Sequence, residues 1–404
     1  MNVLMLSPGF PAEMPLFTRG LAAVGARVIG VGDQHQSAIP QAAKEALSAY
    51  VEVDFANPDE VGGRVREAMR GQTIDRVESL WEPLMLLAAR LREAFGVPGM
   101  TIEQTVPFRD KEVMKQVLDR HGIRTPRHHR ATSAAAVREA AEAIGYPIIV
   151  KPIAGAGSAD THRVDGPHDL ERVIALVKHI PEVSVEEFVD AEEFTFDTVC
   201  AGGRVAFHNI CWYRPRPLIA RQLEWISPQA IALKDPDVAH LAPGVRMGKA
   251  VLDAMGFTEG FTHMEWYLKE NGEAVFGEIG ARPPGARTVD LMNYATDMDL
   301  FSGWAEAVCY GRLSQPVTRK YNAASIFKRA QGTGVIQRIE GLAALMADIG
   351  EHIAALDLLQ PGMPRRDPEQ VLISDGMVVV RHPDLKATME MADRVGVELQ
   401  LYAS

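Results

Sequence analysis

The sequence predicts an α/β protein in which a parallel sheet precedes a region of antiparallel hairpins. In the front region, apolar strand-like segments alternate with helix-like segments, and the strands are expected at 2–8, 26–31, 50–55 and 76–81. Strands that alternate with helices indicate a parallel sheet with helices on both faces. Further along the chain, two hairpin signals, Gly202-Gly203 and Asn271-Gly272, each separate two strand-like segments.

The helices of the front region are predicted from the residues that start them. Asn57 and Pro58 are an N-cap residue and a first-turn proline, so a helix is expected to begin there. Pro83 leads the next helix. No GxGxxG pattern follows the first strand, so the sequence does not support a dinucleotide-binding site. We expect this region to end near residue 105.

The middle of the chain is expected to mix helices with antiparallel strands. Amphipathic patterns predict helices at 110–121, 134–144 and 237–255. Strands are predicted at 148–152, 183–187, 194–200, 205–211, 262–268 and 273–279. The tail from about 320 to 404 also mixes strands and helices and is expected to form a closing subdomain.

Composition limits the classes of function. The 404 residues carry a net charge of −11 and are 47% hydrophobic and 24% charged, which is ordinary for two or three globular domains. An acidic balance argues against a nucleic-acid surface, which needs a basic stripe. No apolar run reaches the ~20 residues of a membrane helix, and no signal peptide is recognised. The three cysteines lack metal or disulfide spacing, so we expect reduced thiols and a cytoplasmic protein.

The strands at 262–268 and 273–279 carry two opposed carboxylates. If Asn271 and Gly272 form a two-residue loop, Glu265 lies opposite Glu278, with Cβ atoms about 4.5–5.5 Å apart. The same face is predicted to carry His263, Tyr267 and Phe276. The other face is predicted to be core, with Met264, Trp266, Leu268, Val275 and Ile279.

Two like charges opposed on a half-buried sheet destabilise it, unless one is protonated or a cation lies between them. A hard divalent ion such as Mg²⁺ prefers carboxylate oxygens and shares its shell with substrate phosphates. The alternative is a pair of exposed glutamates on a solvated sheet face. A β-bulge would also change the register.

A lysine lies near the end of the strand predicted at 148–152, and a loop of small residues follows this strand. Lys151 ends the apolar run, and Gly155, Gly157 and Ser158 lie just beyond it. Small residues let backbone N–H groups approach an anion closely, so the segment is a candidate phosphate site. The alternatives are a strand-end lysine and an ordinary turn. No GKS or GKT follows, which excludes a Walker loop.

In this order along the chain, several segments resemble the ATP-grasp superfamily. They are Asp110-Lys111 with the helix after it and Gly122-Ile-Arg-Thr-Pro126, Tyr146-Pro-Ile-Ile-Val-Lys-Pro152 with its small-residue loop, Val185-Glu-Glu-Phe-Val189 with Glu193-Phe-Thr-Phe-Asp197, His263-Met-Glu-Trp266, and Gly277-Glu-Ile-Gly-Ala-Arg-Pro-Pro-Gly285. The match runs from about 105 to 310, and the front sheet is similar to the domain that usually precedes it.

The resemblance implies a set of site residues. ATP would be bound by Lys111 and Lys151 at the phosphates, by Gly155, Gly157 and Ser158 closing over them, by Glu186, Glu187, Phe188 and Val189 at the adenine, and by Glu193 at the ribose. Glu265 and Glu278 would hold Mg²⁺, with Mn²⁺ as an alternative. Arg282 would be catalytic, because a guanidinium suits the oxyanions of an acyl phosphate.

The resemblance also implies four segments. They are an N-terminal α/β domain at 1–105, a small ATP-grasp subdomain with the phosphate loop at 106–187, a large ATP-grasp subdomain with the metal and catalytic strands at 188–315, and a C-terminal lid at 316–404. One position departs from the family pattern, which commonly has Asn two residues after the second metal Glu. This chain has Gly280 there, so Asp197, His263 or water would have to replace a ligand.

The implied activity is an ATP-dependent, ADP-forming ligase that joins a carboxylate to an amine through an acyl phosphate. Pro283-Pro284-Gly285 resembles amino-acid ligases of the superfamily. Arg214, Arg216, His263 and Arg287 are candidates to bind the carboxylate substrate. Arg214 and Arg216 are equally compatible with a solvated basic loop.

Two other functions stay open from the sequence. A carboxylase of the biotin or purine-pathway type would activate bicarbonate, and the tail resembles the lid of such enzymes. A nucleotide-binding sensor would need neither the glutamate pair nor Arg282. We expect small-molecule partners, no nucleic acid, no membrane, and a homodimer by analogy with the superfamily.

Overall fold

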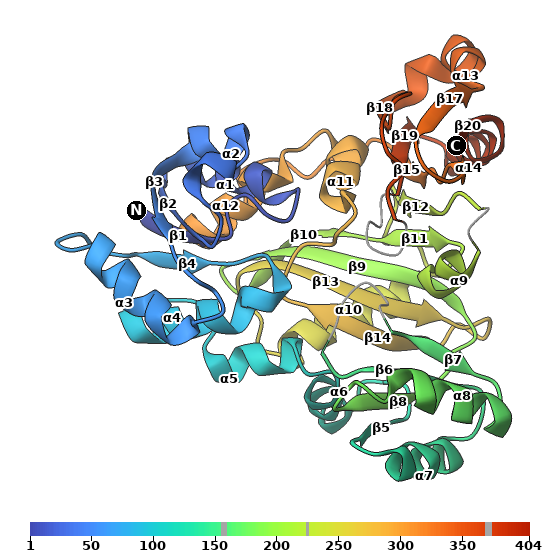
Figure 1. The fold of residues 1–404 in the computed structure, drawn as a ribbon, viewed down its shortest axis with the longest axis horizontal. Helices are drawn as coiled ribbons and strands as arrows, with labels where there is room; N and C mark the ends of the chain where they lie inside the picture. The colour runs from blue at the N-terminus through green and yellow to red at the C-terminus, as the bar shows by residue number, and fades with distance from the viewer. Residues whose placement is uncertain (155–159, 224–225, 368–373) are drawn as a thin grey trace.

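The computed structural model describes residues 1–154, 160–223, 226–367 and 374–404. Within them the strands form four sheets, of four, nine, three and four strands. Figure 1 shows the N-terminal sheet, the small sheet of β5 to β8 and the C-terminal part arranged around the large central sheet. None of the described helices is long and apolar enough to cross a membrane.

The N-terminal sheet is parallel, as predicted, with strand order β3-β2-β1-β4. Its strands are β1 (Asn2–Leu6), β2 (Arg27–Gly32), β3 (Leu47–Glu52) and β4 (Arg76–Glu78), and its helices include α1 (Met14–Ala23), α2 (Gln41–Ala46), α3 (Pro58–Ala68) and α4 (Met85–Phe95). Alternate residues of β1 enter different cores: Val3 and Met5 pack with α1, whereas Leu4 and Leu6 pack with α3 and α4.

The predicted start of α3 is confirmed, but the predicted capping by the Asn57 side chain is wrong. The helix begins at Pro58, but the Asn57 side chain does not bond its first turn. Asn57 Nδ2 donates instead to Asp54 Oδ2 at 2.6 Å. The start of α10 is also corrected, because this helix spans Ala242–Ala254 and not 237–255. Pro243 occupies its first turn, where a proline is favoured.

The small sheet is antiparallel, with order β5-β8-β6-β7. Its strands are β5 (His128–Ala131), β6 (Ile148–Pro152), β7 (His162–Val164) and β8 (Val183–Glu187). The helices around it are α6 (Lys111–Arg120), α7 (Ala134–Ile144) and α8 (Pro167–Val177), whereas α5 (Ile102–Thr105) packs against α4. Asp110 caps α6 by accepting from the N–H groups of Glu112 and Val113, which fixes where Lys111 starts the helix.

The central sheet has nine antiparallel strands, and its order is β14-β13-β9-β11-β12-β15-β19-β18 with β10 paired to β9. Its strands before residue 300 are β9 (Glu192–Ala201), β10 (Arg204–Asn209), β11 (Cys211–Arg214), β12 (Gln229–Ala232), β13 (Gly260–Leu268) and β14 (Ala274–Gly280). Gly202-Gly203 turns β9 into β10, as predicted. The predicted strand at 205–211 is instead divided between β10 and β11. The helices after β11 are α9 (Pro217–Gln222), α10, α11 (Thr288–Thr296) and α12 (Leu300–Tyr310).

The hairpin of β13 and β14 opposes Glu265 and Glu278, although the predicted loop is wrong. Lys269 N–H bonds the Glu273 carbonyl, so three residues, and not two, form the loop. A bulge at Gly277 then shifts the register by one residue and restores the predicted pair. A Cβ on Gly277 would lie 2.8 Å from the Glu265 carbonyl oxygen, so a side chain there would clash with this close approach.

Because of the bulge, two residues lie on the opposite face of the hairpin from the one predicted. Phe276 was predicted on the carboxylate face, but it lies opposite Trp266 and packs with it in the core. Val275 is fully buried, as predicted, but it lies opposite Tyr267 on the carboxylate face and takes no part in that cluster. Both residues precede Gly277, where the register still follows the three-residue loop.

The C-terminal part extends the central sheet with β15 (Asn322–Phe327), β19 (Gly376–His382) and β18 (Ile353–Leu358). A separate small sheet contains β16 (Gln331–Gly332), β20 (Gln400–Ala403) and β17 (Ile336–Glu340), beside α13 (Leu342–Ile349) and α14 (Leu385–Glu398). Sheet hydrogen bonds therefore run continuously across residue 316, between β12 and β15. The division into four domains stays a prediction.

Candidate active site

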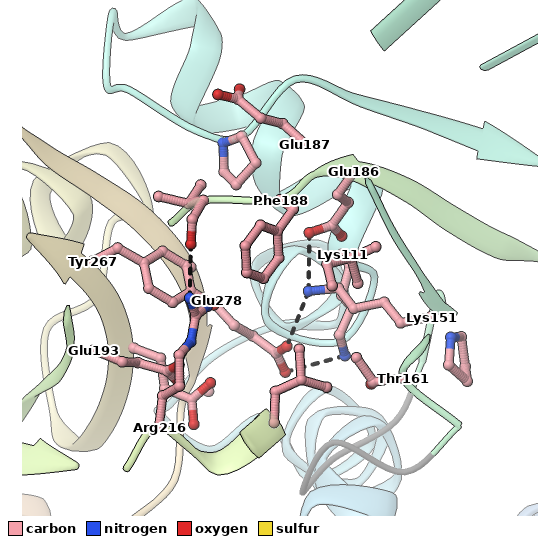
Figure 2. A pocket seen from close by; sticks show the side chains of 18 of the residues that line it. Lys111, Lys151, Thr161, Glu186, Glu187, Phe188, Glu193, Arg216, Tyr267 and Glu278 are labelled. Carbon is pink, nitrogen blue, oxygen red and sulfur yellow. Dashed lines mark hydrogen bonds and ion pairs between the residues drawn. The ribbon is translucent and has the colours of Figure 1, made fainter. Parts of the chain in front are cut away.

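A pocket lies between the small sheet and the edge of the central sheet (Figure 2). Its walls come from α6, β6, the end of β8, β9, β13 and β14, and from the segment after β11. Among its lining residues are Lys111, Lys151, Glu186, Glu187, Phe188, Val189, Glu193, Arg216, His263, Glu265, Tyr267, Glu278 and Arg282. The fold thus brings together residues that the resemblance assigned to one site from five separate segments.

Two lysines at one end of the pocket hold the carboxylates of two glutamates. Lys111 Nζ lies 3.1 Å from Glu278 Oε1. Lys151 Nζ lies 3.0 Å from Glu186 Oε2 and 3.9 Å from Glu278 Oε2. Figure 2 shows Glu278 reaching toward both lysines. We call this group the lysine end of the pocket.

Sequence reasoning missed a third lysine of this group. Lys115 Nζ lies 2.5 Å from Glu186 Oε1, and its side chain is 1% exposed. Lys115 stands one helical turn after Lys111 on α6, so the i, i+4 spacing was the available signal. It does not line the pocket; it supports Glu186 from behind.

These contacts set the protonation states at the lysine end. Burial raises the pKa of Glu186, but the charges of Lys115 and Lys151 outweigh burial and hold this pKa far below its usual range. Burial also raises the pKa of Glu278, and Lys111 with Lys151 lowers it overall. Burial lowers the pKa of Lys151, but Glu186 and Glu278 raise it overall. The pKa shifts of Glu186, Glu278 and Lys151 thus all favour the charged forms, whereas burial lowers the pKa of Lys115.

An arginine fills the opposite end of the pocket. Arg216 Nε lies 3.2 Å from Glu193 Oε2, and Nη1 donates to the Val189 carbonyl at 2.8 Å. Its guanidinium lies 5.1 Å from the centre of the Phe188 ring and 4.9 Å from that of Tyr267. We call these five residues the arginine end of the pocket.

Glu193 titrates differently from Glu186. Burial, followed by the negative charge of Glu265, raises the pKa of Glu193 to about 8, and Arg216 only partly opposes this shift. One arginine at 3.2 Å thus compensates a buried carboxylate less well than the two lysines that hold Glu186.

A buried histidine connects Glu265 to the central sheet. His263 Nδ1 bonds Asp197 Oδ1 at 2.7 Å, and Nε2 lies 3.6 Å from Glu265 Oε1. Burial lowers the pKa of His263, but Asp197 and Glu265 raise it overall to about 9. Asp197 Oδ2 accepts from Thr195 and Asn209, so both oxygens of Asp197 are already engaged.

The glutamate pair fits part of a divalent-metal shell. Glu265 and Glu278 are direct cross-strand partners that both line the pocket, and carboxylate oxygens suit Mg²⁺. Within residues 1–154, 160–223, 226–367 and 374–404, no three His, Cys, Asp or Glu side chains converge as a metal site. Phosphate oxygens and water would have to complete the shell, as is usual for Mg²⁺ bound with a nucleotide.

Arg282 is positioned by a residue from the N-terminal region. Its Nε donates to Glu82 Oε2 at 2.7 Å, and Arg109 bonds the other oxygen of Glu82. Burial lowers the pKa of Arg282, but Glu82 raises it overall. A Cβ on Gly280 would lie 3.2 Å from Arg282 Cγ, so glycine gives the arginine room to lie across the strand. Glu82 was not found from the sequence, because it is far from Arg282 along the chain.

Three predicted residues have side chains directed elsewhere. Arg214 bonds Gln229 and Asp393, and Arg287 bonds Asp290, so neither lines the pocket. Glu187 lines the pocket, but its carboxylate pairs with Arg124 at 2.9 Å and points away from the lysines in Figure 2. Gly155, Gly157 and Ser158 lie outside the described residues.

The chain is similar to known ligases in sequence. Residues 21–99 match the family model of the ATP-grasp N-terminal domain. An L-arginine-specific L-amino acid ligase of Bacillus subtilis is 28% identical over 243 residues, and the match covers 58% of each chain. A D-alanine–D-alanine ligase of Xylella fastidiosa is 33% identical over 162 residues, or 38% of this chain and 53% of that one. The chain thus spans a little over half the length of these relatives.

The fold is that of the ATP-grasp ligases. An L-amino acid ligase from Bacillus licheniformis superposes with a TM-score of 0.81 at 20% identity, covering 100% of this chain and 99% of that one. The N5-carboxyaminoimidazole ribonucleotide synthetase of Thermotoga maritima superposes with a TM-score of 0.73 at 16% identity, over 100% and 99%. The whole chain, and not only its middle, therefore follows this architecture.

Proposed function

The chain has an ATP-grasp N-terminal domain and the fold of the ATP-grasp ligases, and from this premise we propose that it is an ADP-forming carboxylate–amine ligase. The observation that carries the proposal is the lysine end of the pocket. Two lysines from separate segments, Lys111 and Lys151, meet the Glu265–Glu278 pair and Arg282 in one pocket. A phosphoryl-transfer site needs this combination of cations and metal-binding carboxylates.

ATP would bind along the length of the pocket. Its phosphates would pair with Lys111 and Lys151. In the structure these lysines pair instead with the carboxylates of Glu278 and Glu186. Its ribose hydroxyls would donate to Glu193, and its adenine would lie against Phe188 and the Val189 backbone. Lys115 would keep Glu186 ionised once Lys151 turns toward phosphate. Gly155, Gly157 and Ser158 would cover the phosphates.

Mg²⁺ would bind between Glu265, Glu278 and the phosphates, with Mn²⁺ as an alternative. When bound, the ion neutralises the charge that develops on the transferred phosphoryl group. His263 would orient the Glu265 carboxylate, because it lies between Glu265 and the buried Asp197. Asp197 does not line the pocket and both of its oxygens accept hydrogen bonds, which favours His263 or water over Asp197 as a replacement ligand.

Two chemical steps would follow. A substrate carboxylate oxygen attacks the γ-phosphorus, and the bond to the β–γ bridging oxygen breaks to leave ADP and an acyl phosphate. An amine then attacks the acyl carbon, loses a proton, and expels inorganic phosphate. Arg282, held by Glu82, would bind the acyl phosphate and the oxyanion of the second step.

We favour amino acids as the substrates. The relatives named as L-amino acid and D-alanine–D-alanine ligases support an amino acid as the acid and a second one as the amine. The fold also resembles that of a carboxyaminoimidazole synthetase, at a TM-score of 0.73, but likeness at 16% identity concerns the fold alone. Bicarbonate is therefore the second candidate acid.

Phosphate release from ATP and Mg²⁺ tests the proposal across the twenty amino acids, singly and in pairs, with bicarbonate in a separate well. Release that depends on one pair, with ADP and a new amide mass, would establish the ligase and name its substrates. AMP in place of ADP would contradict the acyl-phosphate route. A response to bicarbonate alone would transfer the assignment to a carboxylase.

A further inference from the structure

We propose that Arg216 closes the nucleoside end of the ATP pocket and sets its affinity for nucleotide, so that ATP must displace the guanidinium in order to bind. The inference rests on the proposed function, because it assumes that the arginine end receives the nucleoside. It assigns Arg216 to nucleotide binding, whereas the sequence offered it as a ligand of the substrate carboxylate.

The contacts of Arg216 are those that a nucleoside would need. The carboxylate of Glu193 and the carbonyl of Val189 are acceptors, and Arg216 donates to both of them. A ribose hydroxyl and an exocyclic amino group are donors of the same kind. The guanidinium also lies over the rings of Phe188 and Tyr267, where a flat base would otherwise stack. Arg216 and a nucleoside therefore compete for acceptors and for space.

The lysine end is also occupied by side chains of the protein, but there the charges are the opposite ones. There the cations belong to the proposed site, and carboxylates occupy them in place of phosphates. At the arginine end the acceptors belong to the site, and a protein cation occupies them in place of ribose and adenine. Without nucleotide, both ends of the pocket are thus paired internally.

A neighbouring groove offers the displaced guanidinium a place to go. Arg216 and Glu193 form a wall shared between the pocket and a second, more open cavity. That cavity is also lined by the exposed Glu192 and by Asp393, which pairs with Arg214 at 3.3 Å. A rotation of the Arg216 side chain across this wall would release Val189 and Glu193 and keep the arginine near carboxylates.

Closure has a strict thermodynamic consequence. If only a fraction f of the protein has Arg216 displaced, the apparent dissociation constant is the intrinsic one divided by f. Removing Arg216 should therefore tighten binding of any ligand that needs the nucleoside end. It should not change binding of a ligand that uses the lysine end alone.

The test compares adenosine with inorganic tripolyphosphate by calorimetry on the full chain. Arg216→Ala should bind adenosine about tenfold more tightly than wild type, the lower range for one hydrogen bond to a charged group. Its tripolyphosphate affinity should be unchanged. Arg204→Ala is the matched control, because Arg204 is an exposed arginine of β10 that lines neither the pocket nor the second cavity, so both affinities should stay at wild-type values.

Unchanged or weaker adenosine binding by Arg216→Ala would overturn the inference, and weaker binding would make Arg216 a nucleotide contact. If that variant does not fold, Arg216→Lys decides in its place: tighter adenosine binding supports closure, and unchanged or weaker binding overturns it. If wild type binds ATP but the Arg216 variants bind adenosine no more tightly than wild type, the inference fails and the proposed ligase function stands. Wild type that binds neither ATP nor adenosine would overturn the proposed function as well.

Discussion

Glu186 and Glu193 lie in the same pocket, and both are buried, yet their pKa values move in opposite directions. Glu186 contacts two lysines at 2.5 and 3.0 Å, and their charges overcome the effect of burial. Glu193 contacts one arginine at 3.2 Å and feels the negative charge of Glu265, so burial dominates. Position in the pocket, and not residue type, sets the charge of each glutamate.

The comparison separates two tasks. The lysine end brings lysines and carboxylates together, which suits phosphates and a metal ion. The arginine end has one partly compensated carboxylate and two aromatic rings beside Arg216, which suits a neutral nucleoside. Substitutions at the two ends should therefore change different observables.

The largest effect is expected from Glu278→Ala at the lysine end. This change removes the partner of Lys111 and Lys151 together with half of the proposed metal pair. Turnover, measured as phosphate release, should fall by roughly 10³-fold or more, as for loss of a central electrostatic group. Glu270→Ala, in the exposed loop of the same hairpin, is the control and should retain wild-type turnover. Retained activity in Glu278→Ala would refute the metal assignment.

A large loss of stability is expected from Glu186→Gln. The change leaves Lys115 buried without its ion-pair partner, which costs about 3–5 kcal/mol in comparable pairs. Urea unfolding at neutral pH measures the difference. Glu187→Gln is the control, because Glu187 pairs with a partly exposed Arg124, and about 1 kcal/mol or less is expected there. Equal losses in the two variants would show that Lys115 does not depend on Glu186.

A smaller effect, on binding alone, is expected from Lys151→Ala. Loss of one phosphate cation should weaken ATP and tripolyphosphate by about 10–100-fold, which corresponds to roughly 1.4–2.8 kcal/mol. Adenosine binding should not change, because Lys151 belongs to the lysine end. Calorimetry measures both ligands, with the exposed Lys178→Ala as the control. ATP affinity at the wild-type level would remove Lys151 from the proposed site.

The smallest effect is expected from Glu193→Gln, and it depends on pH. In the folded state the pKa of Glu193 is about 8, above its ordinary value of 4.5. Between these two pH values the folded state therefore binds more protons than the unfolded state. Stability from this group is complete below about pH 4.5 and is lost as pH rises through 8. Glutamine mimics the protonated form, so at pH 9 the variant should be at least about 1 kcal/mol more stable than wild type.

Glu192→Gln provides the control for that pH series. Glu192 is the exposed neighbour of Glu193, so its replacement should leave the pH dependence of the unfolding free energy unchanged. A Glu193→Gln variant that unfolds with the same pH dependence as wild type would show that Arg216 holds Glu193 ionised in the fold. The two ends of the pocket would then have the same electrostatics.

Strand and helix periodicity was enough to predict the architecture, because parallel and antiparallel regions leave different patterns. The strands at 148–152 and 183–187 and the helix at 134–144 have the predicted bounds. The Glu265–Glu278 pair was predicted for the wrong reason: the three-residue loop and the bulge at Gly277 offset each other. A bulge cannot be located from an Asn-Gly signal, because it depends on packing along both strands.

The supporting residues of the site were harder to predict. Lys115 and Glu82 belong to segments whose local pattern fits an ordinary helix surface or turn, and only tertiary contacts reveal their partners. Arg214 and Arg216 are alike in sequence, yet only Arg216 lines the pocket, because Arg214 ends β11 whereas Arg216 lies beyond the strand at the start of α9, where strand alternation no longer applies. Residue type alone could not separate the two arginines.

Transfer of an isotope from the carboxylate tests the central claim most directly. With an ¹⁸O-labelled acid from the productive pair, the acyl-phosphate route predicts one ¹⁸O atom in each inorganic phosphate released, because the leaving phosphate retains the carboxylate oxygen. Mass spectrometry of the phosphate reads this result. Amide formation with unlabelled phosphate, or label in AMP, would contradict the account.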